Sequence, residues 1–241
     1  MLTIEHVTGG YPPRLVVTKD VSFQVDPGKI VGLIGLNGAG KSTIIKQILG
    51  ILRPFSGEIR LNGKTLQQDP VQFRSHLSYI PEVPQFYQEL TLWEHLQFTA
   101  LAYGLTTEEL EYRGNDLLER FRMTKKKNEF PSTFSKGMQQ KVMILCAFLV
   151  ERPYLIVDEP FVGLDPLAID ALVELMKERR EAGTGILVST HILTMAEKYC
   201  DEFILFHEGM IRYKGSMEDI QKQSGKTGAS LEDIFIGVVK E

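Results

Sequence analysis

A glycine-rich segment constrains this chain more than any other feature of its sequence. Residues 35–42 read GLNGAGKS, which fits the pattern G-x-x-x-x-G-K-[ST] of a phosphate-binding loop. The apolar run before it, residues 29–34, is typical of a buried strand, and residues 43–49 form a helical pattern that ends at Gly50. Glycines let backbone N–H groups turn around phosphate oxygens, and the helix adds the positive end of its dipole. The segment therefore predicts a nucleoside triphosphate site; the alternative is a glycine-rich turn that matches by chance.

The side chains at the end of this loop suit the chemistry of a triphosphate. Lys41 can reach the terminal phosphates, and Ser42 can bind Mg²⁺. The residues of this segment that we expect to contact the nucleotide are Asn37, Gly38, Ala39, Gly40, Lys41, Ser42 and Thr43.

Two carboxylates follow a second apolar run, residues 155–157. An all-apolar run suits a parallel strand that is buried on both faces, and ligands bind at the carboxyl end of such strands. Asp158 is placed to bind Mg²⁺, and Glu159 is placed to act as the general base for an attacking water. The alternative is an acidic helix N-terminus before Pro160. The phosphate-binding loop in the same chain favours the metal and base roles.

Further motifs occur in the order that is typical of one large family. Residues 134–141, FSKGMQQK, resemble the signature motif of ATP-binding cassette (ABC) proteins. GLDP at 163–166 resembles the D-loop of that family, and STH at 189–191 resembles its switch histidine. YIPE at 79–82 lies where the family has its Q-loop, and Tyr11 lies where it has an aromatic side chain against adenine.

This resemblance covers about residues 2 to 220 and implies both a fold and an activity. The fold is α/β, a P-loop NTPase of the ABC ATPase type, with a parallel core sheet, an antiparallel β subdomain and a helical subdomain. The activity is ATP hydrolysis with Mg²⁺, coupled to transmembrane transport. We expect one domain, with a core and antiparallel β subdomain at 1–81 and 152–216, a helical subdomain at 82–151 and a short C-terminal tail at 217–241. Residues 2–4, 21–25 and 57–63 have strand patterns, of which the last two alternate as antiparallel strands do, and residues 92–103, 108–121 and 136–150 form helix-like runs.

The resemblance also implies that two copies share each site. In the family, two cassettes pack head to tail around two ATP molecules, so a two-fold dimer makes each contact twice. Ser135 and Gly137 of one subunit are then expected to cap the γ-phosphate held by Lys41 of the other. His191 is expected to contact that phosphate and to position water with Glu159.

Ring side chains outside these motifs receive simpler interpretations. Tyr11 offers a face for adenine, and the alternative is an ordinary loop aromatic within residues 9–13. The other histidines are expected to be structural or exposed; they are His6, His76, His95 and His207.

The motifs depart from the family pattern at three positions. Lys136 and Met138 stand where glycine and glutamine are common, and Glu82 replaces the usual Q-loop glutamine. Glu82 keeps an oxygen that can contact nucleotide or metal, so the predicted Mg²⁺ ligands are Ser42, Glu82 and Asp158. The chain resembles the ATP-binding subunits of Ecs-type transporters of Gram-positive bacteria, which share Glu82 and Lys136. That resemblance implies an exporter linked to peptide or exoprotein secretion.

Composition agrees with a subunit that works beside a membrane. The net charge of −4 gives no sign of nucleic-acid binding. Cys146 and Cys200 lie in apolar helical patterns, have no metal spacing and are interpreted as reduced core residues. The apolar run at 142–150 has nine residues, whereas a membrane span needs about twenty. We find no signal peptide. The family resemblance then implies a cytoplasmic chain held at the inner face of the membrane by a separate multi-spanning permease, with a second copy of itself as its other partner.

Two other classes of protein remain open. A non-transport ABC ATPase of translation or DNA repair is disfavoured because the chain has one cassette and no heptad run. A nucleotide-gated regulatory module with little hydrolysis is disfavoured by Glu159 and His191.

The segment 82–92 is the predicted contact with the permease. In ABC proteins a short cytoplasmic helix of the membrane subunit fits beside the Q-loop. Phe86 and Tyr87 are unusually apolar for a surface loop, and aromatic anchors are typical of interfaces. The alternative is that they cap the core of the helical subdomain.

Overall fold

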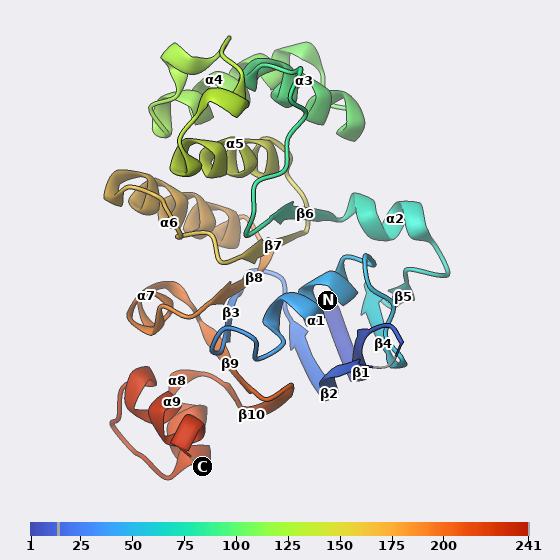
Figure 1. Cartoon of the computed structure of the whole chain (residues 1–241), viewed down its shortest axis with the longest axis vertical. Coiled ribbons are helices and arrows are strands. Elements are labelled where there is room, and N and C mark those ends of the chain that lie inside the picture. Colours follow the sequence, from blue (N-terminus) through green and yellow to red (C-terminus); the bar gives the residue numbers. More distant parts are fainter. Residues whose placement is uncertain (14, 241) are drawn as a thin grey trace.

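The chain forms two sheets and an outlying group of helices (Figure 1), in a computed structural model that describes residues 1–13 and 15–240. Arg14, and Glu241 at the end of the predicted tail, lie outside the described residues. The strands are β1 (Leu2–Tyr11), β2 (Leu15–Val25), β3 (Ile30–Ile34), β4 (Ser56–Leu61), β5 (Lys64–Thr65), β6 (Leu77–Ile80), β7 (Tyr154–Asp158), β8 (Gly185–Thr190), β9 (Glu202–His207) and β10 (Met210–Gly215). The helices are α1 (Lys41–Ile48), α2 (Pro70–Ser75), α3 (Leu92–Tyr103), α4 (Thr107–Arg120), α5 (Lys136–Leu149), α6 (Pro166–Glu181), α7 (Leu193–Tyr199), α8 (Met217–Ser224) and α9 (Leu231–Lys240), with short 3₁₀ turns at Thr124–Lys126 and Pro131–Thr133.

The larger sheet has the order β10-β9-β3-β8-β7-β6, and all of its pairs are parallel except β10 with β9. Strands β3, β7 and β8 are buried at every residue, which explains their continuous apolar sequences. Alternate residues of β7 serve opposite faces: Leu155 and Val157 pack with the helices α3–α6, and Ile156 packs with α1 and the second sheet. The predicted parallel core sheet is confirmed.

The second sheet is antiparallel, with the order β2-β1-β4-β5. This confirms the antiparallel strands predicted at 21–25 and 57–63. Strand β1 is longer than the predicted residues 2–4, because it pairs with β2 as far as Tyr11, opposite Leu15. The interpretation of residues 9–13 as a loop is therefore wrong for residues 9–11, since cross-strand pairing was not visible in the local sequence.

Helices α3, α4 and α5 match the helical runs predicted at 92–103, 108–121 and 136–150 to within about one residue. The side chains of Thr91 and Thr106 cap α3 and α4, each in a reciprocal capping box with a glutamate three residues later. The Arg120 side chain on α4 donates to Glu178 on α6, at 2.7 and 3.0 Å, and so ties this helical group to the core.

The C-terminal helices α8 and α9 lie at the opposite end of the molecule from α3 and α4 (Figure 1). Ile220, Leu231 and Phe235 pack with Ala196 of α7 and Leu205 of β9. Within residues 1–13 and 15–240, none of the helices combines the length and hydropathy that a membrane span requires.

Both cysteines are free thiols. Cys146 lies on α5 as predicted, whereas Cys200 directly follows the last residue of α7. Burial raises the pKa of the Cys146 thiol to about 11 and also raises the pKa of Cys200. Both side chains therefore stay protonated near neutral pH and are poor nucleophiles.

Candidate active site

The phosphate-binding loop joins the end of β3 to α1, as the sequence predicts. The helix begins at Lys41, two residues before the predicted run, since Gly40 caps it in the left-handed region at φ 111°. Any larger residue at Gly40 is disfavoured by this φ, and its Cβ would also lie 2.9 Å from the Phe206 ring. The N–H groups of Thr43 and Ile44 donate to Gly40 O at 3.1 Å, whereas those of Lys41 and Ser42 precede the first intrahelical bond, which suits an anion at this end.

The Lys41 side chain is 5% exposed and turns back into the loop. Its ammonium donates to the carbonyl oxygens of Gly35 at 2.7 Å and Leu36 at 3.2 Å. It also lies 3.1 Å from Glu159 Oε1, an ion pair whose angles are not those of a hydrogen bond. A buried cation is thus held at the centre of the site by groups that a triphosphate can replace.

Asp158 ends β7 and faces α1. Its Oδ1 accepts hydrogen bonds from the hydroxyls of Ser189, at 2.5 Å, and Ser42, at 3.4 Å. Burial raises the pKa of this carboxyl, and the two hydroxyls partly oppose that rise. Ser42 and Asp158, predicted from distant segments as ligands of one metal, lie side by side.

Ser189 is a site residue that sequence reasoning missed. It lies opposite Asp158 in the β7–β8 register, is fully buried, and its Oγ also accepts the backbone N–H of Glu159 at 3.0 Å. Its hydroxyl thereby links both carboxylate residues. The segment 189–191 was singled out for its histidine, but the register that brings Ser189 to Asp158 could not be read from it.

Glu159 follows the strand in the left-handed region, at φ 46°, and its side chain is 6% exposed. A non-glycine residue held there costs about 1–3 kcal/mol and persists only where the surroundings fix it. The carboxylate lies between Lys41 and His191, whose Nδ1 is 2.8 Å from Glu159 Oε2. The structure therefore brings the predicted base and the predicted switch histidine together.

A cavity of about 380 Å³ opens beside these groups, within the usual size range of ligand sites. The predicted residues that line it are Tyr11, Asn37, Gly38, Gly40, Lys41, Ser42, Thr43, Glu82 and Glu159. Leu15, Val17 and Leu36 also line it and were not predicted. Ala39 lies in the same loop but is buried against the core.

Tyr11 forms the outer wall of this cavity and is 36% exposed. A hydrogen bond with Thr43 lowers the pKa of its phenol, and Lys46, whose Nζ lies 3.4 Å from the hydroxyl, lowers it further. With Leu15 and Val17 beside it, the ring provides a flat apolar surface that suits a nucleobase.

Ser135 and Gly137 do not line this cavity. Ser135 caps α5, its Oγ accepting from Met138 N at 3.4 Å, and both Ser135 and Lys136 are exposed. Gly137 packs against the D-loop: a Cβ there would lie 2.2 Å from Gly163 O. The predicted nucleotide residues of one chain therefore form two separate sets.

The oxygen ligands fit Mg²⁺ that is shared with phosphate. Burial raises the pKa of the Tyr79 phenol, and the charges of Asp158 and Glu82 raise it further, so both carboxylates lie near this side chain. In the described part of the chain, no three His, Cys, Asp or Glu side chains gather as a complete metal site. Mg²⁺ commonly takes one or two carboxylates and completes its shell with water and substrate phosphates.

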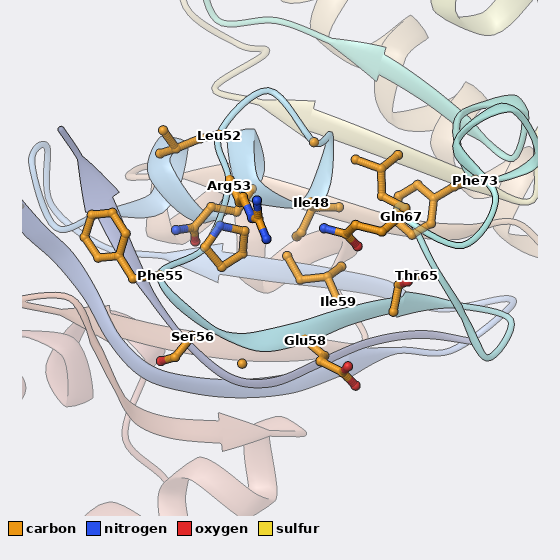
Figure 2. Close-up of a pocket in the computed structure, with 15 residues that line it drawn as sticks. Ile48, Leu52, Arg53, Phe55, Ser56, Glu58, Ile59, Thr65, Gln67 and Phe73 are labelled. Atoms are coloured by element: carbon orange, nitrogen blue, oxygen red, sulfur yellow. The ribbon is translucent and has the colours of Figure 1, made fainter.

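A larger cavity, of about 710 Å³, lies elsewhere, between α1, β4 and α2. Figure 2 shows Ile48, Arg53, Phe55, Ile59 and Phe73 around it. It shares no residue with the cavity at the phosphate-binding loop and contains none of the predicted site residues. The chemistry of the lining, and not the volume, therefore identifies the candidate active site.

Comparisons with known proteins agree with this site. The ABC transporter family model matches residues 18–162. The ABC-type transporter ATP-binding protein EcsA of Bacillus subtilis (strain 168) is 53% identical over 241 residues, covering 100% of this chain and 97% of the relative. The ABC transporter ATP-binding protein NatA of the same organism is 31% identical over 224 residues, covering 91% of each chain.

Solved structures give the same fold. An ATP-binding subunit of an ABC transporter superposes with a TM-score of 0.95 at 51% identity, over 99% of each chain. An ATP-binding cassette solved as a dimer with ADP and Pi superposes with a TM-score of 0.82 at 22% identity, over 90% of this chain and 99% of that one. At that identity the second likeness shows the fold alone.

Proposed function

This chain belongs to the ABC transporter family, as an ATP-binding subunit with ATPase activity and Mg²⁺ as its cofactor. We propose that two copies close head to tail on two ATP molecules and that this closure drives transport. The observation that carries this proposal is the separation of the nucleotide residues into two sets. Lys41, Ser42 and Glu159 line one cavity, whereas Ser135 lies outside it at the exposed start of α5. A second copy can bring its Ser135 to the cavity of the first.

Within one half-site, the buried charges have distinct roles. Lys41 leaves the carbonyls of Gly35 and Leu36 to bind the terminal phosphates, which frees Glu159 from its cation. Glu159 Oε1, the oxygen that Lys41 releases, then takes a proton from the attacking water, while the contact of Oε2 with His191 fixes the carboxylate's orientation.

Metal binding is assigned to the other side of the half-site. Ser42, Asp158 and Glu82 supply oxygen ligands for Mg²⁺, and Ser189 holds Asp158 and the Glu159 backbone in place. Bound Mg²⁺ neutralises charge on the transferred phosphate. Tyr11, with Leu15 and Val17, stacks on the base.

Mixing two inactive variants tests the shared site. Ser135→Arg keeps the phosphate-binding loop, and Lys41→Ala keeps the signature end. At equal amounts, half of the dimers are mixed and each has one complete site, so ATPase should recover to about a quarter of the wild-type value. The matched control mixes Ser135→Arg with the Ser135→Arg/Lys41→Ala double variant, which offers no intact signature. Recovery that does not exceed this control contradicts the head-to-tail arrangement.

We propose a separate multi-spanning permease as the second partner, which places the chain at the cytoplasmic face of the membrane. The support is an exposed apolar surface after the Q-loop. Val83 is 65% exposed, Tyr87 is 55% exposed, and the Tyr87 ring lies 5.2 Å from that of Phe98. Phe86 packs against the core that contains α3, α4 and α5, so for Phe86 the alternative of a core-capping residue is the better one. Leu92, at the end of the segment, is fully buried and cannot contact a partner.

Co-purification with a co-expressed membrane subunit tests this surface. Tyr87→Asp should abolish co-purification and leave basal ATPase intact, since truncating an interface anchor typically costs about 2 kcal/mol or more. Tyr112→Asp is the matched control, because Tyr112 is an 80% exposed tyrosine on α4 outside this surface. Equal co-purification of both variants contradicts a permease contact at Tyr87.

We propose, more narrowly, that the transporter is an exporter linked to the secretion of peptides or exoproteins. The support is the resemblance to Ecs-type subunits, which extends over the whole chain at 53% identity to EcsA. Deleting the gene should change the amount of secreted protein, and a catalytically inactive Glu159→Gln copy should not restore it. An unchanged secreted fraction contradicts this assignment and leaves the ATPase assignment standing.

A further inference from the structure

One glutamine on α5 connects the signature end of the molecule directly to the nucleotide cavity. Gln140 is 3% exposed, and its Nε2 donates to Pro81 O at 3.0 Å, across 59 residues of sequence. Pro81 follows β6, and the next residue, Glu82, lines the cavity. A carbonyl can only accept, so the orientation of the Gln140 amide is fixed by this bond.

The bond controls the direction of the Q-loop and not merely its packing. The Pro81 carbonyl and the Glu82 nitrogen belong to one planar peptide unit. Because this plane also contains the Glu82 Cα, holding the carbonyl sets the direction in which the chain enters Glu82. Gln140 lies five residues after Ser135 on the same helix, so a rotation of α5 carries the Q-loop backbone with it.

The neighbouring contacts of α5 make the helix a rigid link. Lys141, 8% exposed, donates to Asp165 Oδ2 at 2.7 Å, and Asp165 Oδ1 caps α6 by accepting from Ala168 N at 3.0 Å. Gly137 lies against Gly163 O so closely that no Cβ fits. The signature end is thus joined to the D-loop as well as, through Gln140, to the Q-loop.

Gln140 still has unused bonding capacity. Its Oε1 is buried and has no partner among residues 1–13 and 15–240, although buried polar atoms are usually paired. Gln140 Nε2 already bonds the Q-loop at Pro81 O, so backbone N–H groups of the same loop are the candidate donors to Oε1. A shift of the Q-loop when Glu82 meets its ligand would allow one of them to reach Oε1.

We propose that Gln140 is a positioning residue that couples the Glu82 side of the nucleotide cavity to the signature end of α5. This inference rests on the proposed function, because it assigns Gln140 a role in completing the shared site. ATP bound in the cavity of one chain orders the Q-loop, and the Gln140 bond transfers that order to α5 and Ser135. Without the bond, ATP binds normally but α5 no longer responds.

The chain offers a matched pair of variants for the test. Gln139, the adjacent residue, also donates its Nε2 to a backbone carbonyl, that of Pro131 at 3.1 Å, but this contact stays within the helical group. Gln140→Met and Gln139→Met each replace an unbranched amide with an unbranched apolar side chain. Each removes one bond of similar length from the same helix, so a loss of stability alone should lower the melting temperature of both.

The measurements are ATP affinity, steady-state ATPase, and amide hydrogen exchange with and without ATP. For Gln140→Met we expect unchanged ATP affinity and KM, and a kcat that is lower by about tenfold or more, as is typical of lost positioning. ATP should still protect residues 35–48 from exchange but should no longer protect residues 135–149. Gln139→Met should keep both protections and near-normal turnover.

Three results would overturn the inference: turnover of Gln140→Met equal to that of Gln139→Met, protection of residues 135–149 that persists in Gln140→Met, or a loss of turnover matched by a loss of ATP affinity. Measured in the Ser135→Arg background, which we expect to remain a single chain, the exchange responds to ATP binding and not to closure on a second copy. It therefore decides the coupling even if the mixing experiment rejects the shared site.

Discussion

The phosphate-binding edge of this chain and its signature edge differ in how complete they are. Lys41, Asp158 and Glu159 are 5%, 3% and 6% exposed and contact one another or shared hydroxyls. At the signature edge, Ser135 and Lys136 are exposed, and within the described part of the chain the Ser135 hydroxyl bonds only the first turn of its own helix. Folding therefore completes the charged centre at one edge and leaves the other edge exposed, where we propose that a second copy binds.

At the phosphate-binding edge, we expect Glu159→Gln to have the largest effect on ATP hydrolysis. The amide keeps the shape of the carboxylate but cannot take a proton, so hydrolysis should fall by about 10²-fold or more, while ATP binding persists. Phosphate release and equilibrium ATP binding measure the two effects separately. Turnover near the wild-type value rules out Glu159 as the base.

The corresponding change at the open edge is Ser135→Arg. Its bulk and charge should block closure over the partner's γ-phosphate and lower turnover by about 10²-fold, the usual cost of losing one transition-state donor. ATP affinity of the single chain should be unchanged, because Ser135 does not line the cavity. If affinity falls together with turnover, the two edges are not separate.

Lys41→Ala should produce the opposite pattern. The variant removes the cation that meets the terminal phosphates, so ATP affinity should weaken by about 10- to 100-fold, the value of a hydrogen bond to a charged group. Calorimetry with ATP and with AMP separates this effect, since AMP lacks the terminal phosphates and should bind both proteins equally. An equal loss for AMP would mean a general distortion of the loop.

Asp158→Asn should raise the stability of the ligand-free protein at pH 7. Burial raises the pKa of Asp158 above its ordinary 3.8, so its favourable contribution to stability is present at acid pH and is lost as the pH rises through the folded-state pKa. The gain in melting temperature should therefore shrink as the pH is lowered toward 3.8. Mg²⁺-dependent stabilisation by ATP should disappear in the same variant. A melting temperature below wild type at pH 7 contradicts this account of Asp158.

Lys136→Ala should have the smallest effect. Lys136 is exposed, so ligand-free stability should change by no more than about 0.5 kcal/mol, and single-chain ATP affinity should be unaltered. Urea unfolding and ATP titration measure both. A large loss of affinity would show that the signature edge contacts nucleotide within its own chain.

The sequence was sufficient where the chemistry lies in consecutive residues. Lys41 and Ser42 were predicted because loop and helix are contiguous, and the helical runs of α3 and α5 were predicted because their patterns are local. Contacts set by register were not accessible: Ser189 reaches Asp158 only because β7 and β8 align those two residues. The bond from Gln140 to Pro81 depends likewise on how α5 rests on β6, which no local pattern encodes.

Backbone conformation was the other limit. Nothing local to Glu159 indicates that it adopts a positive φ, and the strand pairing that extends β1 to Tyr11 is a long-range contact. The unpredicted cavity residues Leu15 and Val17 belong to β2, the strand that pairs with that extension. Their place in the cavity wall follows from the pairing of β1 with β2, which the sequence did not reveal.

Sedimentation of Glu159→Gln with Mg²⁺ and ATP tests the central claim most directly, since slow hydrolysis should preserve the closed state. We predict a species of twice the 27.3 kDa chain mass with ATP, a single chain without it, and a single chain for Glu159→Gln/Ser135→Arg even when ATP is saturating. A Glu159→Gln protein that binds ATP and stays at the mass of one chain, or a double variant that dimerises equally well, would contradict a site shared between two copies.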